Sequence, residues 1–469
     1  MKNKNILHQL LRIVLIIGLL LFPMKVQAAP RVQETGAVPV IVIDPGHGGS
    51  NEGTLSGNTK EKEMCLITAK AMYDELCKYD GIQVYMTRTA DVDMTLKERA
   101  EYAASVNADF LFSLHFNASE NHTMYGSEVW ISSVLPYHAY GYQFGYAYLT
   151  QMQKQGMFLR GVKTRLGDDG TDYYGIIRES VTLSVPAVII EHCYVDHERD
   201  TAYCATEEQW KELGRNNAHI VAGYFGLSGT EPGVNSQSVN MSLPEVDIMQ
   251  QMPHTQRDTT APDVCMLELL ETDYNTGDVS LKVTATDYDS ALMYYDYSLD
   301  GGETFSALEP WPEFDALAGT YRDTFTLHLQ IPANTQPAII LRAYNTADLD
   351  TESNQITFLH SFATNKTSDK SPAEVTFSES APDIDKPIAL QEKENTSIGT
   401  TTFLPASAAS TEETKSSENT LLSFLQISLA AAILILLMVI ITQCINSHKR
   451  RKRRHQRIKE LESQTYQPK

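Results

Sequence analysis

The chain has 469 residues, with 59 acidic against 38 basic side chains and a formal net charge of −21. This balance argues against a nucleic acid as the partner, because binding to phosphates depends on clustered lysine and arginine. The six cysteines are spread along the chain and do not form the dense framework of a disulfide-stapled protein. We expect free buried thiols, with a Cys193–Cys204 bridge as the open alternative.

Residues 1–29 have the layout of a secretory signal peptide. Basic side chains at Lys2 and Lys4 precede an apolar run at 13–22, and small residues stand near the expected cleavage point at Ala28. The alternative is an uncleaved anchor helix. The run is short for that role, since a span needs about 20 apolar residues.

Residues 38–227 alternate between strand and helix patterns. Apolar runs and turn residues predict strands, listed in chain order, at 38–43, 82–87, 110–115, 129–132 and 186–191. Helical spacing predicts helices at 66–76 and 139–155, and capping residues at Thr95 and Thr206 open two more. This alternation predicts a single α/β domain with one mostly parallel sheet and flanking helices.

The sequence pattern changes after residue 227. Residues 228–260 have little periodicity and are predicted to be a linker. Residues 261–362 contain several short runs in which apolar and polar side chains alternate, with a hairpin signal at 300–302 (Asp-Gly-Gly). They are predicted to form an all-β sandwich of the immunoglobulin-like kind, acting as a spacer or binding module.

The C-terminal part has a membrane-anchor pattern. Residues 363–420, rich in Ser, Thr, Glu and Pro, are predicted to be a disordered stalk. Residues 421–442 are long and apolar enough for one transmembrane helix, and six consecutive basic residues follow at 449–454. Because positive charge stays on the cytoplasmic side, the tail at 443–469 is expected inside the cell and the rest outside.

Four side chains lie where an α/β sheet assembles its sites. His47 follows the first strand within the segment Asp-Pro-Gly-His-Gly-Gly. His115 and Glu191 end two later strands, and Glu61 lies at the start of a helix. Two histidines and one carboxylate, with water in the fourth place, are a standard catalytic zinc set. A second carboxylate nearby can act as the general base on that water.

These segments resemble the zinc-dependent N-acetylmuramoyl-L-alanine amidase family of bacterial cell walls. The matching pieces, in chain order, are VIVIDPGHGGSNEGT, EKEMCLITAKAM, LKERAEYAASVNADFLFSLHFNAS and VPAVIIEHCYVD. The resemblance implies Zn²⁺ held by His47, Glu61 and His115, with Glu191 as the catalytic glutamate. Glu63 is the competing second ligand; Glu61 is preferred because the family's Glu-Lys pair precedes the helix.

The chain departs from the family at Cys65, where the family has Asn, and at His192 and Cys193, where it has small and apolar residues. We expect His192 to support the metal ligands rather than to join a second metal site with Cys193, His197 and Cys204, since these lack paired Cys-x-x-Cys spacing. Arg178 is the candidate for binding a carboxylate of the substrate's stem peptide, with an ordinary surface arginine as the default alternative.

The resemblance implies hydrolysis, outside the cell, of the amide bond between N-acetylmuramic acid and L-alanine in peptidoglycan. Two other functions stay open: a zinc peptidase that cuts within the stem peptide, and a non-catalytic wall-binding or adhesion protein. A further alternative concerns the anchor. Residues 404–408 (Leu-Pro-Ala-Ser-Ala) are similar to a sortase sorting signal, which would transfer the protein onto the wall.

Overall fold

The computed structural model describes residues 38–57, 59–227 and 243–363. The predicted signal peptide, the first part of the linker, the transmembrane helix and the basic tail lie outside the described residues, as does the stalk beyond Ala363. No helix within the described ranges is long and apolar enough to cross a membrane.

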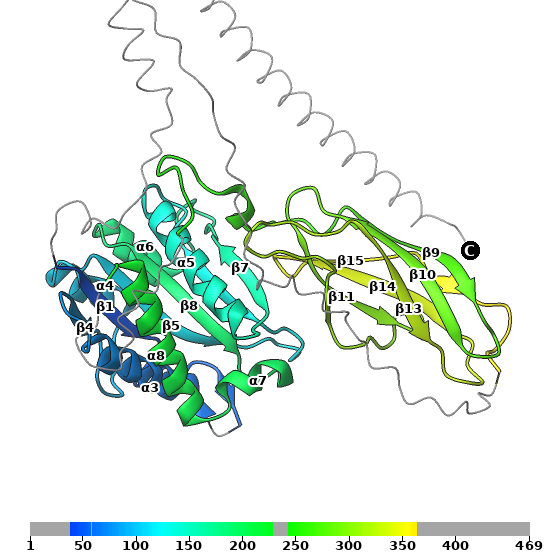
Figure 1. Cartoon of the computed structure of the whole chain (residues 1–469), viewed down its shortest axis with the longest axis horizontal. Coiled ribbons are helices and arrows are strands. Elements are labelled where there is room, and N and C mark those ends of the chain that lie inside the picture. The colour runs from blue at the N-terminus through cyan, green and yellow to red at the C-terminus, as the bar shows by residue number, and fades with distance from the viewer. Residues whose placement is uncertain (1–37, 58, 228–242, 364–469) are drawn as a thin grey trace, which may run out of the picture. The chain divides into compact units, whose positions relative to one another are not determined.

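One six-stranded sheet forms the centre of the first domain, in the order β4-β1-β5-β8-β6-β7 (Figure 1). Its strands, in chain order, are β1 (Val40–Pro45), β4 (Gln83–Met86), β5 (Phe110–Asn117), β6 (Ser127–Ile131), β7 (Leu159–Lys163) and β8 (Ala187–Tyr194). Every neighbouring pair is parallel except β6 and β8, which are antiparallel. The predicted α/β domain is therefore confirmed, with a mixed sheet. Strand β7 was not predicted.

Helices cover both faces of this sheet. They are α3 (Glu61–Leu76), α4 (Leu96–Ser105), α5 (Tyr137–Lys154), α6 (Gly175–Thr182), α7 (Glu198–Cys204) and α8 (Glu207–Tyr224). Buried side chains of α3, α5 and α8 share one core with the sheet, and those of α4 and α6 share another. Both predicted capping residues act as expected: Thr95 and Thr206 each accept a hydrogen bond from the backbone of the third helical residue.

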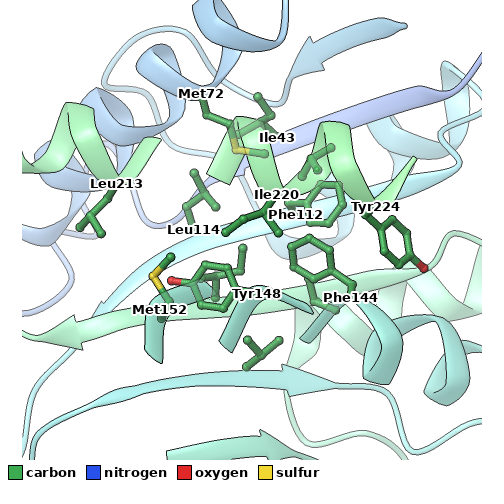
Figure 2. Close-up of a cluster of buried hydrophobic side chains, with 14 of the residues drawn as sticks. Ile43, Met72, Phe112, Leu114, Phe144, Tyr148, Met152, Leu213, Ile220 and Tyr224 are labelled. Atoms are coloured by element: carbon green, nitrogen blue, oxygen red, sulfur yellow. The ribbon is translucent and has the colours of Figure 1, made fainter. Parts of the chain in front are cut away.

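The larger core depends on the continuous apolar run of β5 (Figure 2). The ring of Phe112 stacks on that of Phe110, with 4.5 Å between centroids, and lies 4.6 Å from that of Phe144 on α5. Tyr224 of α8 meets Phe110 and Phe144 edge to face. These contacts fix α5 and α8 against β5, and β5 carries one of the predicted metal ligands.

The second domain is built from antiparallel strands, so the predicted β-rich region is confirmed. The strands are β9 (Val264–Thr272), β10 (Asp278–Thr286), β11 (Leu292–Ser298), β12 (Glu309–Pro310), β13 (Thr324–Gln330), β14 (Ala338–Asn345), β15 (Asp350–Glu352) and β16 (Ile356–Thr357). The sheet β13-β10-β9 and the sheet around β11 and β14 share one hydrophobic core. Two short elements complete the described structure. The β2–β3 pair (Leu55–Ser56, Thr59–Lys60) lies between β1 and α3, and the 3₁₀ turn η1 (Pro253–Thr255) precedes β9.

Replacing Phe112 by alanine is expected to destabilise the α/β domain by about 3–5 kcal/mol, since the removed ring leaves a cavity among rigid neighbours. Urea unfolding followed by the helical circular dichroism signal measures this, because the described helices belong to that domain. Leu166→Ala is the control: Leu166 is 56% exposed, and its loss should stay within about 0.5 kcal/mol. Equal effects of both substitutions would contradict the assigned core.

Candidate metal centre

Three side chains predicted as metal ligands meet at one point. His47 Nε2 lies 3.0 Å from Glu61 Oε2, and His115 Nδ1 lies 3.0 Å from Glu61 Oε1. The two histidine nitrogens are 3.1 Å apart. Within the described part of the chain, these residues form the one group of three or more His, Cys, Asp or Glu side chains placed to hold a metal ion. Glu63, the competing ligand, is exposed and lies outside the group.

The parallel pairing of β1 with β5 brings the two histidines together. Pro45 of β1 lies opposite Leu114 of β5 in the register, so the chain leaves β1 beside the end of β5. His47 follows two residues later, and His115 is the residue after Leu114. Strand ends of this kind are where α/β sheets assemble their sites.

Glu61 enters from the first residue of α3, and backbone amides fix its carboxylate. Oε2 accepts a hydrogen bond from the amide of Thr54 at 2.8 Å, and Oε1 accepts one from the amide of Phe116 at 3.1 Å. Burial alone would raise the pKa of Glu61, but hydrogen bonds to His115 and His47 lower it well below its usual range. The ligand carboxylate is therefore held in its charged form.

Two buried arginines hold the loop that carries His47. Arg88 donates to the carbonyls of Pro45 at 3.0 Å and of Gly46 at 2.7 Å. Arg99 donates to the carbonyls of Pro45 at 2.7 Å and of His47 at 2.5 Å. Each arginine is at most 3% exposed. Neither arginine could be identified from the sequence, since nothing in its local pattern separates it from surface arginines.

The glycines of this loop leave room for the ligands. A Cβ on Gly46 would lie 2.3 Å from Cε1 of His115, and one on Gly53 would lie 2.6 Å from Oε2 of Glu61. Either side chain would push a ligand away from the other two. The sequence pattern around His47 thus provides space as well as backbone freedom.

Glu191 lies beside the three ligands, on the neighbouring strand. It is opposite His115 in the β5–β8 register, so both side chains project from the same face of the sheet. Its Oε2 is buried and has no hydrogen-bond partner within the described residues. Burial and the nearby carboxylates of Glu61 and Glu128 raise the pKa of Glu191 well above its usual range.

A further acidic residue, Glu128 on β6, lies opposite Glu191 in the antiparallel register. It is 2% exposed and accepts hydrogen bonds from Arg160 Nε at 2.9 Å and Lys163 Nζ at 2.8 Å. Burial alone would raise its pKa, but Lys163 and Arg160 lower the pKa to about 2. The pKa of Glu128 therefore shifts in the opposite direction to that of the neighbouring Glu191. The sequence analysis did not identify Glu128.

His192 contacts the backbone of a metal ligand, as the sequence analysis expected of a supporting residue. It is fully buried, with Nδ1 2.8 Å from the carbonyl oxygen of His115 and Nε2 2.8 Å from Asn217. Burial lowers its pKa to about 4, so the ring is neutral near pH 7. Cys193 and Cys204 are free buried thiols, and the alternative disulfide between them is not formed.

Arg178, the predicted substrate contact, lies on α6 and outside the metal group. Its Nη1 donates to the backbone carbonyls of Asp172 at 2.7 Å and Tyr173 at 3.0 Å, which ties the turn before α6 to the helix. A role toward substrate stays a prediction for this residue.

The donor set fits a zinc-sized ion. Two imidazole nitrogens and one carboxylate face each other at 3.0–3.1 Å, close to the spacing of ligands that lie about 2.0–2.1 Å from one tetrahedral metal. A further carboxylate oxygen, on Glu191, is buried next to this set and has no partner in the part of the chain that the structure describes. An α/β domain with such a donor set at its strand ends has the arrangement that metal-dependent hydrolases use.

Comparison with known proteins indicates which family of hydrolases the chain resembles. Residues 41–222 match the N-acetylmuramoyl-L-alanine amidase family. N-acetylmuramoyl-L-alanine amidase CwlM of Bacillus licheniformis is 30% identical over 189 residues, which are 40% of this chain and 69% of CwlM. The sporulation-specific N-acetylmuramoyl-L-alanine amidase of Bacillus subtilis is 29% identical over 191 residues, which are 40% of this chain and 69% of that protein.

Among solved structures, an N-acetylmuramoyl-L-alanine amidase from Clostridium difficile 630 is 28% identical; the match covers 40% of this chain and 96% of that one, with a TM-score of 0.35. On the sequence matches, the chain belongs to the N-acetylmuramoyl-L-alanine amidase family. The predicted family and enzyme class are thereby confirmed.

His115→Ala is expected to weaken zinc binding by more than about 100-fold. Losing a residue that only hydrogen-bonds to a metal ligand already lowers metal affinity about 10- to 100-fold, and losing a ligand itself should lower it further. Elemental analysis of the dialysed protein measures this. His122→Ala is the control, since His122 is exposed and pairs only with Asp196 in the described structure. Full zinc occupancy in the His115 variant would exclude His115 as a ligand.

Proposed function

We propose that this protein is a zinc-dependent amidase that cleaves the bond between N-acetylmuramic acid and L-alanine in peptidoglycan. The meeting of His47, Glu61 and His115 beside Glu191 carries the proposal, because it combines a metal site with a carboxylate free to move a proton. The names of the relatives support the substrate: CwlM and the sporulation-specific protein are both N-acetylmuramoyl-L-alanine amidases.

In this proposal, His47, Glu61 and His115 hold the zinc ion. When bound there, zinc polarises the amide carbonyl and makes a water more acidic. Glu191 accepts a proton from the attacking water and gives it to the leaving nitrogen of L-alanine, so that one residue serves as base and then as acid.

Neighbouring residues hold the proposed metal ligands in position. Arg88 and Arg99 hold the backbone before and at His47, so that this ligand does not drift from the other two. His192, neutral and buried, fixes the carbonyl of His115. A zinc peptidase acting within the stem peptide would use the same residues, whereas a purely wall-binding protein would need neither the metal ligands nor Glu191.

Purified protein is expected to release free stem peptides that begin with L-alanine from peptidoglycan, and a chelator should stop the release. Glu191→Gln should keep zinc and fold but lower the rate by about 10² to 10⁴, the usual contribution of a general base. Mass spectrometry of the products checks the bond. Cuts inside the peptide would favour the peptidase instead, and loss of zinc from the variant would make Glu191 a ligand.

We also propose that the protein is exported and stays in the membrane, with the amidase domain outside and residues 443–469 in the cytoplasm. The apolar segment 421–442 and the basic run 449–454 support this arrangement. The acidic segment before them would let the enzyme reach wall that lies away from the membrane.

Cell fractionation tests the anchor. A tag at the C-terminus is expected to stay on the full-length protein and to be recovered with the membranes. Substituting Leu404 and Pro405 by alanine gives the matched control, because these changes should leave the location unaltered. Protein bound covalently to peptidoglycan, and released into the membrane by these substitutions, would support the sortase alternative and contradict the anchor.

A further inference from the structure

A cavity of about 210 Å³ lies next to Glu128, where the α/β domain, residues 254–257 and the turn between β14 and β15 meet. It opens on the Glu128 side of Glu191, since Glu128 lines it and pairs with Glu191 in the sheet register. The residues that define its chemistry are Glu128, Trp130, Lys163, Arg165, Arg257 and Asp348.

Contacts between the elements shape this cavity. Thr164, at the end of β7, donates its amide to the carbonyl of Thr255 at 2.6 Å, so the segment with Arg257 extends along the edge strand. Arg160 Nη2 donates to both carboxylate oxygens of Asp348, at 2.8 and 2.6 Å, which fixes the β14–β15 turn as the opposite wall.

The charges in the cavity do not cancel. The two acids are compensated: Glu128 by Arg160 and Lys163, and Asp348 by Arg160. Two arginines are left. Arg165 stacks on the ring of Tyr173, 3.5 Å from its centroid, and within the described residues no carboxylate forms an ion pair with either half-buried Arg165 or exposed Arg257. In a chain with a net charge of −21, two guanidinium groups in one cavity without acidic partners favour an anionic ligand.

We propose that this cavity is a subsite that binds a carboxylate of the stem peptide through Arg165 and Arg257, with its far wall supplied by the β domain. The proposal rests on the proposed amidase function. In the proposed reaction Glu191 protonates the leaving nitrogen, so the peptide would begin beside Glu191, and Glu128 and the cavity come next along the sheet. The volume is below the about 300–1,000 Å³ of sites for drug-sized ligands, and fits one or two peptide residues.

The test compares two small substrates on the full chain. One is N-acetylmuramoyl-L-alanyl-γ-D-glutamyl-L-lysine with free carboxylates, and the other is the same compound with both carboxylates amidated. The unaltered protein is expected to have a KM about 10-fold or more lower for the free form, as charge-assisted hydrogen bonds predict. Arg165→Gln with Arg257→Gln should remove that preference by raising KM for the free form, with kcat retained.

A matched control removes two positive charges elsewhere. Lys211→Gln with Arg215→Gln, on the exposed surface of α8, should keep the preference. Ala347→Trp fills the cavity from the β14–β15 turn and should raise KM for the free form while zinc content stays full. If the protein is active but shows no preference, or if the arginine pair and the control behave alike, the subsite is wrong and the amidase function stands. If neither substrate nor peptidoglycan is cleaved at this bond, the function itself fails.

Discussion

The loop between β1 and α3 must hold one shape, because it carries His47 and passes directly over His115. Hydrogen bonds from two buried guanidinium groups impose that shape: Arg88 and Arg99 bind successive carbonyls of the loop. Arg99 also pairs with buried Asp44 at 2.7 Å, so its charge is compensated within the buried site. Removing one member of such a buried pair leaves an uncompensated charge, which is far more costly than losing a surface ion pair. The candidate metal centre therefore depends on buried charges that lie outside the predicted ligand set.

A large part of the fold follows from local sequence. The apolar runs predicted β1, β5 and β8, and the capping residues predicted α4 and α8, because burial and capping act within a few residues. The meeting of His47 with His115 also followed, since parallel strands end at one edge of a sheet. Strand β7 could not be predicted in the same way. All five of its residues are buried, yet two are Arg160 and Lys163, and their acidic partners lie 32 to 188 positions away in the sequence. Only tertiary contacts make this strand stable.

The one antiparallel pairing in the sheet, between β8 and β6, has a chemical consequence. It places Glu128 beside Glu191, so three carboxylates with Glu61 occupy a small region. Two of them are held in the charged form, Glu61 by histidines and Glu128 by Lys163 and Arg160. Glu191 receives no such support and its pKa moves the other way. Environments that separate the pKa values of neighbouring acids suit them to different tasks, and this separation agrees with the roles proposed above for Glu61 and Glu191.

The β domain is more than a spacer in this arrangement. Arg160 is 1% exposed and binds Glu128 of the α/β domain with one part of its guanidinium group and Asp348 of the β domain with another. Tyr294, also from the β domain, accepts a hydrogen bond from Arg160 at 3.2 Å. Without the β domain, buried Arg160 would lose two of its partners, Asp348 and Tyr294. The surroundings of its third partner, Glu128, which lies opposite Glu191 in the sheet, would then change. The junction between the domains therefore shares one electrostatic network with Glu128, the neighbour of Glu191 in the sheet, and under the proposed function this network connects the β14–β15 turn to the amidase site.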